Sequence, residues 1–331
     1  MTSESTAHPV LAAVTRGSHV ESFHRGAVAI VRDGRLVYAA GDVDKLQFWR
    51  SAAKPFQALA ALGALRKAGF AVSDPERALL AASHGGTDAQ VAVVRGLLAR
   101  AGVPESCLKC GVHTPYDSGA AAALQRAGLK PTPLHHNCSG KHAGMLAAAT
   151  VRGLPIDDYL NPDHPVQIDN REMLARFADC APEDVVTEID GCSAPTFALS
   201  ARHAAFAFAR FAASTDPDAV DLRRAVAADP TLYAGTGRTC TKLLEAAGPE
   251  LYPKAGAEGF YALGLGGPGL GMAVKFDDGS HRATEPLLAT LLLKFAPELR
   301  PDRRAAVAEL IASPVKNAAG RAVGEIRIQL P

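Results

Sequence analysis

Strand-like segments in this sequence lie near its two ends, and the long middle has helical spacing instead. The clearest is a hairpin, in which the apolar runs Gly26–Val31 and Leu36–Ala40 flank Asp33-Gly34, a dipeptide typical of tight turns. Further strands are expected at about residues 8–14, 260–265, 270–276 and 322–330. A chain with this distribution buries its strands most simply by pairing its two ends in one antiparallel sheet.

The middle of the chain is expected to be mostly helical. Residues 51–67 are rich in Ala and Leu at helical spacing, and Pro55 suits a first turn, where its missing N–H is harmless. Further helices are expected at about residues 75–82, 88–101, 118–126, 140–152, 165–178, 197–213, 218–228, 238–247, 284–296 and 302–312. The predicted fold class is α+β, an antiparallel sheet built from both chain ends with a mostly helical inserted domain. Residues 1–331 then form one catalytic unit, with a sheet part at about 8–50 and 250–331 and a helical part at about 51–249.

Charge and composition argue against several classes of partner. The 331 residues include 35 Lys and Arg against 34 Asp and Glu, and this net charge of +1 gives no basic surplus for nucleic acid. The apolar runs are too short to span a bilayer, and the first residues lack a basic stretch followed by an apolar core, so no signal peptide is expected. Six cysteines without a secretion signal indicate free thiols or ligands, and the cytoplasm is the expected location.

Ser51 and Lys54 form an S-x-x-K pattern at the start of the first predicted helix. Residues three apart lie on one face of a helix, so the Lys54 amine is expected beside the Ser51 hydroxyl. A partly desolvated lysine can be the base that makes a serine nucleophilic, and the helix N-terminus adds backbone N–H donors. By itself the pattern is weak, because an Ala-rich helix can contain it by chance.

For two further polar segments, taken alone, the structural explanation is better than the functional one. Ser83-His84-Gly85-Gly86 follows a predicted helix, and its glycines either let the backbone approach a ligand or form the turn that ends the helix. Lys254 begins the segment KAGAEG, which alone indicates a polar turn before a strand.

Two segments place a cysteine where a helix is expected to begin. HHNCSGKHAGM contains Cys138 and DGCSAPTF contains Cys192, and a helix N-terminus favours the thiolate form. Two thiolates with nearby nitrogen donors make a plausible zinc site, while two buried structural cysteines explain the spacing equally well. Cys107 and Cys110 form a C-x-x-C, which we interpret as a surface loop pair because no strand of the thioredoxin type precedes it.

Taken together, the segments RSAAKPFQ, SHGG, NCSGKHAGM, DGCSAPTFALS and KAGAEG resemble the rhizobial-type, or class 3, L-asparaginases. The resemblance runs through most of the chain. NCSGKHAGM and DGCSAPTFALS are specific to that family, whereas S-x-x-K is not. The resemblance implies a fold similar to serine β-lactamases and glutaminases, L-asparagine as the substrate, and a homodimer.

The resemblance also implies roles for individual residues. Two serine–lysine pairs carry the catalysis, Ser51 with Lys54 and Ser83 with a lysine on a facing strand. Lys254 matches that second lysine, and Lys275 is a weaker candidate for it. One zinc ion per chain, supporting substrate binding rather than the chemistry, is bound by Cys138, Lys141 and Cys192, and the substrate is contacted by Asp190, His84 and Arg50. Of these last three, Asp190 suits the α-ammonium group.

Three other functions compete with this interpretation. A glutaminase or another small-amide hydrolase differs by one methylene in its substrate, which is worth only about 1–3 kcal/mol in a pocket. A β-lactam acylase acts on the cell wall, and the expected absence of an export signal counts against it. A zinc or redox sensor without catalytic activity needs only the pair Cys138 and Cys192. Release of ammonia from asparagine separates the sensor from the enzymes.

Overall fold

The computed structural model describes residues 7–267 and 269–331, which form two compact units. Unit 1 consists of the chain up to Trp49, the segment Leu199–Ala213 and the segment Lys242–Pro331. Unit 2 consists of Arg50–Ala198 and Ser214–Thr241. In the described ranges no helix is both long and apolar enough to cross a membrane.

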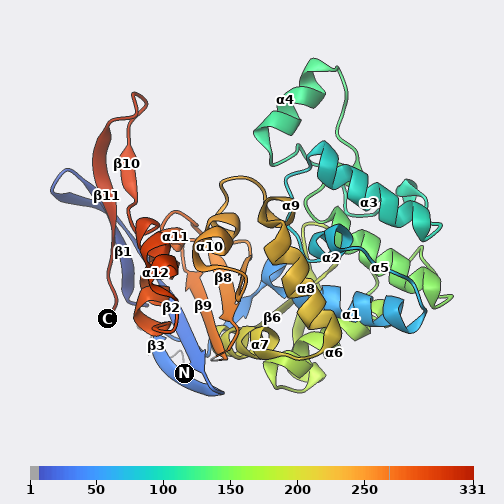
Figure 1. The fold of residues 1–331 in the computed structure, drawn as a ribbon, viewed down its shortest axis with the longest axis horizontal. Coiled ribbons are helices and arrows are strands. Elements are labelled where there is room, and N and C mark those ends of the chain that lie inside the picture. The colour runs from blue at the N-terminus through green and yellow to red at the C-terminus, as the bar shows by residue number, and fades with distance from the viewer. Residues whose placement is uncertain (1–6, 268) are drawn as a thin grey trace, which may run out of the picture. The chain divides into compact units, whose positions relative to one another are not determined.

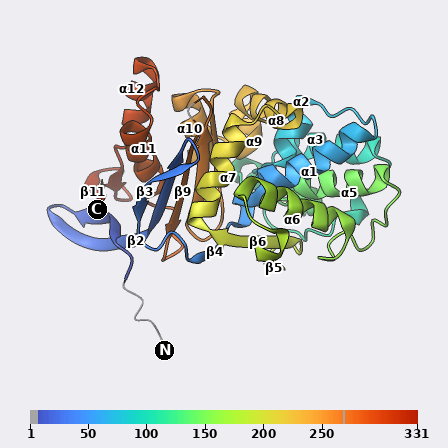
Figure 2. The same cartoon turned by 90° about the horizontal axis from the view of Figure 1, so that it is seen from below.

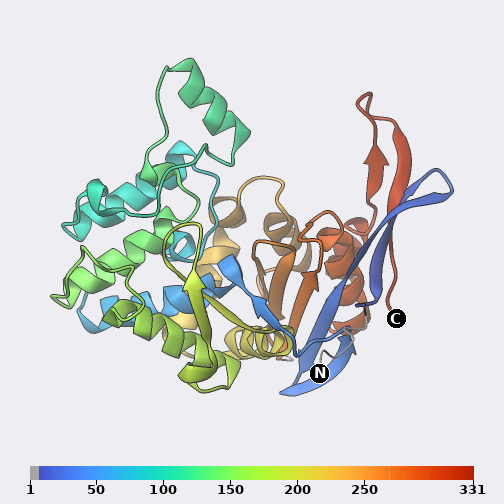
Figure 3. The same ribbon diagram turned by 180° about the vertical axis from the view of Figure 1, so that it is seen from behind.

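The sheet of unit 1 is built from both ends of the chain, as predicted (Figure 1). Its strand order is β10-β11-β1-β2-β9-β8-β7, and β3 pairs with β2. The neighbouring strands of this sheet pair in antiparallel orientation. An antiparallel sheet combined with a mostly helical part confirms the predicted α+β class. The strands are β1 (Val10–Arg16), β2 (His19–Arg32), β3 (Arg35–Ala40), β7 (Leu251–Ala255), β8 (Phe260–Leu265), β9 (Leu270–Phe276), β10 (Pro314–Lys316) and β11 (Ala322–Ile328). Figure 3 shows β1 and β11 lying side by side, so the first and last strands of the chain are paired neighbours, with β10 outside them at the edge of the sheet.

The predicted hairpin is the pair β2 and β3. Val28 faces Ala40 across the pair, and the turn residues Asp33 and Gly34 have φ angles of 48° and 69°. Two successive residues with positive φ make the turn whose twist matches that of the flanking strands. The Asp-Gly dipeptide therefore fixes the register of β2, which runs through the middle of the sheet.

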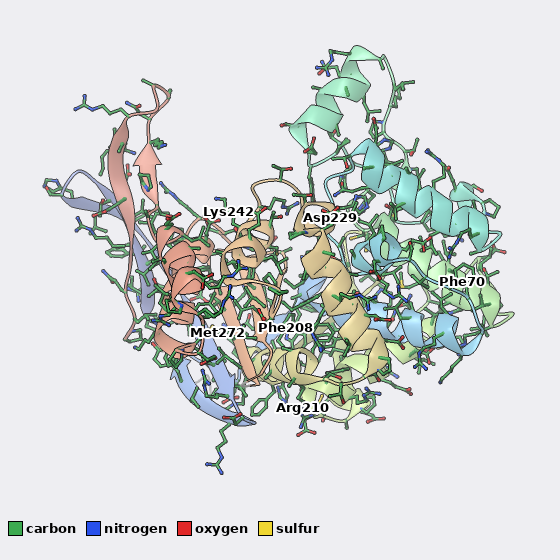
Figure 4. The ribbon with its side chains drawn as sticks, viewed as in Figure 1. Phe70, Phe208, Arg210, Asp229, Lys242 and Met272 are labelled. Atoms are coloured by element: carbon green, nitrogen blue, oxygen red, sulfur yellow. The ribbon has the colours of Figure 1, made fainter. Side chains whose placement is uncertain are left out.

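Helices cover both faces of the sheet of unit 1 (Figure 2). On one face α7 (Ala201–Ala213) packs against β9, β8 and β2, and on the other lie α11 (Thr284–Phe295) and α12 (Pro301–Glu309). The contact with α7 is close because a Cβ on Gly271 would lie 1.9 Å from the carbonyl oxygen of Ala205. Phe208 of α7 and Met272 of β9 carry fully buried side chains (Figure 4). Residues 201–213 therefore belong to the unit that contains the sheet. The sequence analysis assigns them to the helical part at about 51–249, and that assignment is wrong for this segment.

Unit 2 is mostly helical, with α1 at its centre. Helix α1 packs against α5 and α6, and its residues from Lys54 to Leu62 are all buried. The elements of unit 2 are η1 (Arg50–Ala53), α1 (Lys54–Lys67), α2 (Asp74–Leu80), α3 (Asp88–Arg100), η2 (Glu105–Cys107), α4 (Ser118–Arg126), η3 (Pro133–His135), α5 (Ser139–Val151), α6 (Pro165–Ala178), η4 (Pro182–Asp184), β5 (Val186–Ile189), α8 (Pro217–Ala228) and α9 (Pro230–Ala234). Strand β4 (Leu46–Phe48) lies in unit 1, while β6 (Pro195–Ser200) and α10 (Thr239–Ala247) continue from unit 2 into unit 1.

The prediction that a helix begins near Cys192 is wrong. Residues 191–194 form a turn, and Pro195–Ser200 form the strand β6, which pairs with β5. The reason is tertiary, because every residue of β6 is buried and its β-branched and aromatic residues Thr196 and Phe197 suit a buried strand. Cys138, by contrast, caps the N-terminus of α5 as predicted.

Candidate active site

The segment Arg50–Lys54 begins unit 2 with a strained residue followed by a tight turn of helix. Arg50 has a φ angle of 50°, which is uncommon for a residue with a side chain. Ser51 follows in the 3₁₀ helix η1, and Lys54 is the first residue of α1. In a 3₁₀ helix, residues three apart lie directly above one another, so Ser51 and Lys54 share a face. Backbone strain of this kind is concentrated at functional sites.

The Lys54 amine is surrounded by three oxygen atoms. Its Nζ lies 2.7 Å from the carbonyl oxygen of Ala82, 3.0 Å from Oγ of Ser83 and 3.5 Å from the carbonyl oxygen of Asn137. The side chain is 1% exposed. The sequence pattern does not reveal this arrangement, because the acceptors come from the end of α2 and the start of α5.

Burial lowers the pKa of Lys54. A neutral amine has two N–H bonds and one lone pair. If the two N–H groups donate to the carbonyls of Ala82 and Asn137, the lone pair faces the hydroxyl of Ser83. The arrangement therefore suits a lysine that accepts and returns a proton.

Among the described residues, the Lys54 amine contacts the hydroxyl of Ser83 and not that of Ser51. Ser51 is half-buried, and its Oγ makes no hydrogen bond to the residues that the structure describes. Its hydroxyl is thus available to a substrate, while Lys54 can exchange protons with Ser83.

His84 lies in the interior, with both ring nitrogens in use. It is 0% exposed, Nδ1 accepts from the backbone N–H of Gly86, and Nε2 lies 2.8 Å from Oγ of Ser139. Because Nδ1 accepts, Nε2 carries the proton, and Ser139 passes its own proton to the carbonyl of Leu134. Burial lowers the pKa of His84 to about 3, so the ring stays neutral. These bonds leave His84 no nitrogen for a substrate and make it a support for the loop after Ser83.

The cysteines Cys138 and Cys192 meet in the interior of unit 2 beside Lys141. Both sulfurs are buried, and Nζ of Lys141 lies 3.2 Å from Sγ of Cys192. The hydrogen bond from Cys192, together with the charges of Lys54 and Lys141, lowers the pKa of Cys138 well below its ordinary value. The same hydrogen bond and burial raise the pKa of Cys192. The pair thus shares one negative charge, which neighbouring lysines stabilise.

Asp190 is tied to the start of the site by Arg50. Its Oδ1 lies 2.6 Å from Nη2 and 2.8 Å from Nε of Arg50, and it also accepts from the N–H of Gly191. Burial opposes ionisation of Asp190, but the charges of Lys141 and Arg50 outweigh it and lower the pKa. Oδ2 lies 3.9 Å from Sγ of Cys192. The ion pair between Arg50 and Asp190 fixes the Arg50 side chain. Through it, the residue before Ser51 contacts a carboxylate that lies beside Cys192.

The donor set of this cluster fits zinc in its chemistry. Thiolates are ligands that zinc prefers, and both cysteine sulfurs are buried here, with the Lys141 amine 3.2 Å from Sγ of Cys192. Among the described residues, no three His, Cys, Asp or Glu side chains converge on a point that suits a metal ion. Lys141 would be the third protein ligand of a zinc ion bound here, and its amine, whose pKa the charges of the two cysteines raise, would have to lose its proton first.

The two candidate lysines of unit 1 occupy different environments. Lys254 lies on β7, the edge strand of the sheet, is 2% exposed, and donates to the carbonyl of Ala255. Lys275 lies on the inner strand β9 and is half-buried, with its amine bound to the carbonyls of Glu258 and Phe276. An edge-strand position is what the family resemblance implies for the second catalytic lysine, and Lys254 occupies it.

A cavity of about 300 Å³ lies in unit 2 beside the glycines that follow Ser83. Its lining carries one cation, Arg238, which donates to the carbonyl of Ser83 at 3.4 Å, and two carboxylates. The two carboxylates belong to Asp117 and Asp229, and each of them also caps the N-terminus of a helix. Asp229 is labelled in Figure 4. A cavity with both signs of charge and this volume suits a small zwitterion.

The C-x-x-C segment is not the surface pair that the sequence indicated. Cys107 is half-buried, and Cys110 is 1% exposed, with its sulfur 3.5 Å from the carbonyl of Pro133. Burial raises the pKa of Cys110 to about 12, so it stays a thiol. All six cysteines are free, as expected for a chain without a disulfide framework.

Comparison with known proteins gives one match along the sequence. The model of a family described as L-asparaginase II covers residues 12–328. No curated protein sequence matches the chain significantly. Among solved structures, Mglu is similar at 15% identity and a TM-score of 0.39, over 84% of this chain and 68% of that one. A β-lactamase from Mycobacterium bovis is similar at 14% identity and a TM-score of 0.40, over 86% and 95% of the two chains.

Proposed function

Because the chain belongs to the L-asparaginase II family, and so is an amidohydrolase, we propose that it hydrolyses L-asparagine to L-aspartate and ammonia through an acylated serine. The observation that carries this proposal is the contact of a buried lysine, Lys54, with a serine hydroxyl, that of Ser83. Serine–lysine chemistry needs an amine that is neutral near physiological pH, and burial lowers the pKa of this one.

In the proposed reaction Ser51 is the nucleophile and Lys54 its base. Lys54 accepts the Ser51 proton while Oγ attacks the side-chain amide carbon of asparagine. The backbone N–H of Ser51 stabilises the resulting oxyanion. The carbon–nitrogen bond then breaks, and the departing nitrogen takes a proton from Lys54, directly or through Ser83, and leaves as ammonia. Water next attacks the carbonyl carbon of the aspartyl ester while Lys54 takes its proton. The bond from that carbon to Oγ of Ser51 then breaks, Oγ takes the proton back from Lys54, and L-aspartate leaves.

Ser83 is the alternative nucleophile. The 3.0 Å contact favours it, because the Lys54 lone pair faces this hydroxyl and not that of Ser51. Ser51 is preferred because its Oγ has no partner among the described residues and lies on the face of Lys54 at the start of α1. Identifying the acylated residue separates the two mechanisms.

The second part of the proposal concerns substrate binding. Asp190 is the proposed contact of the α-ammonium group, with Arg50 holding it in place. Cys138, Lys141 and Cys192 are the proposed ligands of one zinc ion. A bound zinc supplies positive charge that helps to orient the substrate. A homodimer, which the resemblance implies, and a cytoplasmic location, which the cysteine usage indicates, are also parts of the proposal.

Removing the metal is expected to weaken substrate binding more than turnover. The serines and lysines supply nucleophile and base, so chelation or Cys192→Ser should raise KM for asparagine and leave kcat within about tenfold. Metal analysis of the purified protein comes first, followed by steady-state kinetics with and without chelator. Loss of kcat at unchanged KM would show instead that the metal takes part in the chemistry.

The pH dependence of turnover is expected to follow Lys54. Its pKa is lowered by burial, so the neutral amine forms at a lower pH than for an exposed lysine. We expect kcat to rise with pH through this lowered pKa and to fall as the amine gains a proton at lower pH. A pH–rate profile checks this, with Lys54→Arg as the variant that stays charged. A wild-type profile that is flat where lysines titrate would contradict the assignment.

An ammonia-release assay tests the proposed function itself. The purified protein is offered L-asparagine, L-glutamine and a penicillin. The proposal expects asparagine to be the best substrate, and a higher kcat/KM for glutamine would make the protein a glutaminase. No turnover of any amide would contradict the proposal.

A further inference from the structure

Three charged side chains line the cavity beside the glycines that follow Ser83, and none of them forms an ion pair among the described residues. They are Arg238, Asp117 and Asp229. Arg238 donates to the carbonyl oxygen of Ser83 at 3.4 Å, and its guanidinium carbon lies 5.8 Å from the ring centre of Tyr116. Neither partner carries a negative charge. The guanidinium therefore keeps most of its N–H donors for a ligand in the cavity.

Each of the two carboxylates uses one oxygen to cap a helix and leaves the other without a hydrogen bond. Oδ1 of Asp117 accepts from the backbone N–H of Ala120 in α4 at 2.8 Å. Oδ1 of Asp229 accepts from the backbone N–H of Leu232 at 2.8 Å and from the hydroxyl of Thr231 at 2.7 Å. Oδ2 of each aspartate makes no hydrogen bond to a described residue. Each aspartate thus has an acceptor oxygen left for a positively charged group.

Hydrogen bonds between the walls of the cavity hold the two carboxylates in place. The backbone N–H of Asp117 donates to the carbonyl oxygen of Gly85 at 3.0 Å. The buried side chain of Gln90, on α3, donates to the carbonyl oxygen of Leu232, on α9, at 2.9 Å. Because Asp117 caps α4 and Asp229 caps α9, both carboxylates have defined positions before a ligand binds. Binding then requires little ordering of the protein.

The charges that line the cavity select the class of ligand. A simple anion is attracted by Arg238 but repelled by the two aspartates, and a simple cation is repelled by Arg238. A zwitterion satisfies both signs of charge at once, and an α-amino acid carries both groups on a single carbon. The planar guanidinium of an arginine matches a carboxylate in geometry. A volume of about 300 Å³ lies at the lower end of the range for ligand pockets, which favours a small molecule.

We propose that this cavity is a binding site for a free α-amino acid with a small side chain, in which Arg238 binds the carboxylate and the two aspartates bind the ammonium group. Ser51, Lys54 and Asp190 are not among the described residues that line it, so the site is separate from the proposed substrate contacts. Arg238 also connects the site to the catalytic loop, through its bond to the carbonyl oxygen of Ser83. The inference goes beyond the proposed function and does not require turnover.

Isothermal titration calorimetry of the full-length protein with L-serine tests the site, because L-serine has both charges and no amide to hydrolyse. We expect saturable binding of L-serine. Ethanolamine lacks the carboxylate and 3-hydroxypropanoate lacks the ammonium group, so each should bind at least about tenfold more weakly. Absence of L-serine binding would overturn the proposal, and so would ethanolamine or 3-hydroxypropanoate binding as tightly as L-serine.

Two variants remove one charge each and keep the local structure. Arg238→Gln retains an N–H donor for the carbonyl of Ser83, and Asp229→Asn retains the cap of α9, since asparagine caps helices as well as aspartate. Each should weaken L-serine binding by about tenfold or more. Arg152→Gln and Asp216→Asn are the matched controls, because they change the same residue types in unit 2 outside the cavity, and Asp216 caps α8. The controls should bind L-serine like the wild type, and circular dichroism checks each fold.

Asp190→Asn separates this site from the proposed substrate site. We expect it to leave the L-serine binding that Arg238→Gln weakens unchanged, because Asp190 does not line the cavity. Binding that Asp190→Asn abolishes and Arg238→Gln leaves intact would place L-serine in the proposed substrate site alone and overturn the inference. If the protein hydrolyses no amide, the proposed function fails, while these titrations still decide whether the cavity binds an amino acid.

Discussion

Replacing Lys54 by methionine is expected to lower kcat by about 10³-fold or more, because it removes the buried amine that contacts the Ser83 hydroxyl and is the proposed base for Ser51. Methionine keeps most of the side-chain volume in this buried position, so the fold should persist. Steady-state kinetics of asparagine hydrolysis measure the effect, and circular dichroism checks the fold.

Ser51→Ala should cost as much as Lys54→Met, and the double variant should cost little more than either. Residues that act as one catalytic unit lose their effect together, so their losses do not add. Near-normal turnover in a folded Lys54→Met protein would remove the serine–lysine mechanism. Normal turnover in Ser51→Ala together with an inactive Ser83→Ala would transfer the nucleophile to Ser83.

The second large effect is expected at Lys254. Lys254→Met should lower kcat by about 10²–10⁴-fold, the range typical of a group that transfers protons in the transition state. Lys275→Met is the matched control, because it changes the same residue type on the sheet of the same unit. The Lys275 amine binds the carbonyls of Glu258 and Phe276, so its loss should affect stability and not kcat. An active Lys254→Met with an inactive Lys275→Met would reverse the assignment.

Much of the fold could be predicted because local chemistry and tertiary structure agree there. The Asp33-Gly34 turn, the strands Phe260–Leu265 and Leu270–Phe276, and the helix Pro165–Ala178 appear where the sequence places them. In each case turn residues or proline mark the ends of a regular apolar pattern. Helix boundaries elsewhere shift by a few residues, as for α12, which ends at Glu309.

The errors in predicted secondary structure arise where tertiary packing, and not the local sequence, determines whether a segment is helix or strand. The segment 197–213 was predicted as one helix because Ala and Phe recur at helical spacing, but Pro195–Ser200 is a buried strand and only Ala201–Ala213 is helical. No local signal distinguishes these two halves. The glycines that admit α7 to the sheet, Gly264 and Gly271, lie far away in the sequence.

The sequence motifs predict which residues make up the candidate site, but they do not predict which of these side chains contact one another. Motifs identify Ser51, Lys54 and Ser83, but the contact of Lys54 with Ser83 depends on how the end of α2 packs beside α1. The carbonyl oxygens that hold the amine carry no sequence signal at all.

The measurement that tests the central claim most directly is identification of the acylated residue. The protein is mixed with L-asparagine, quenched within one turnover and digested, and its peptides are analysed by mass spectrometry. The account predicts an aspartyl ester on Ser51, absent from Ser51→Ala and accompanied by release of one ammonia per ester. Ammonia release at the normal rate with no adduct on either Ser51 or Ser83, or an adduct on another residue, would contradict it.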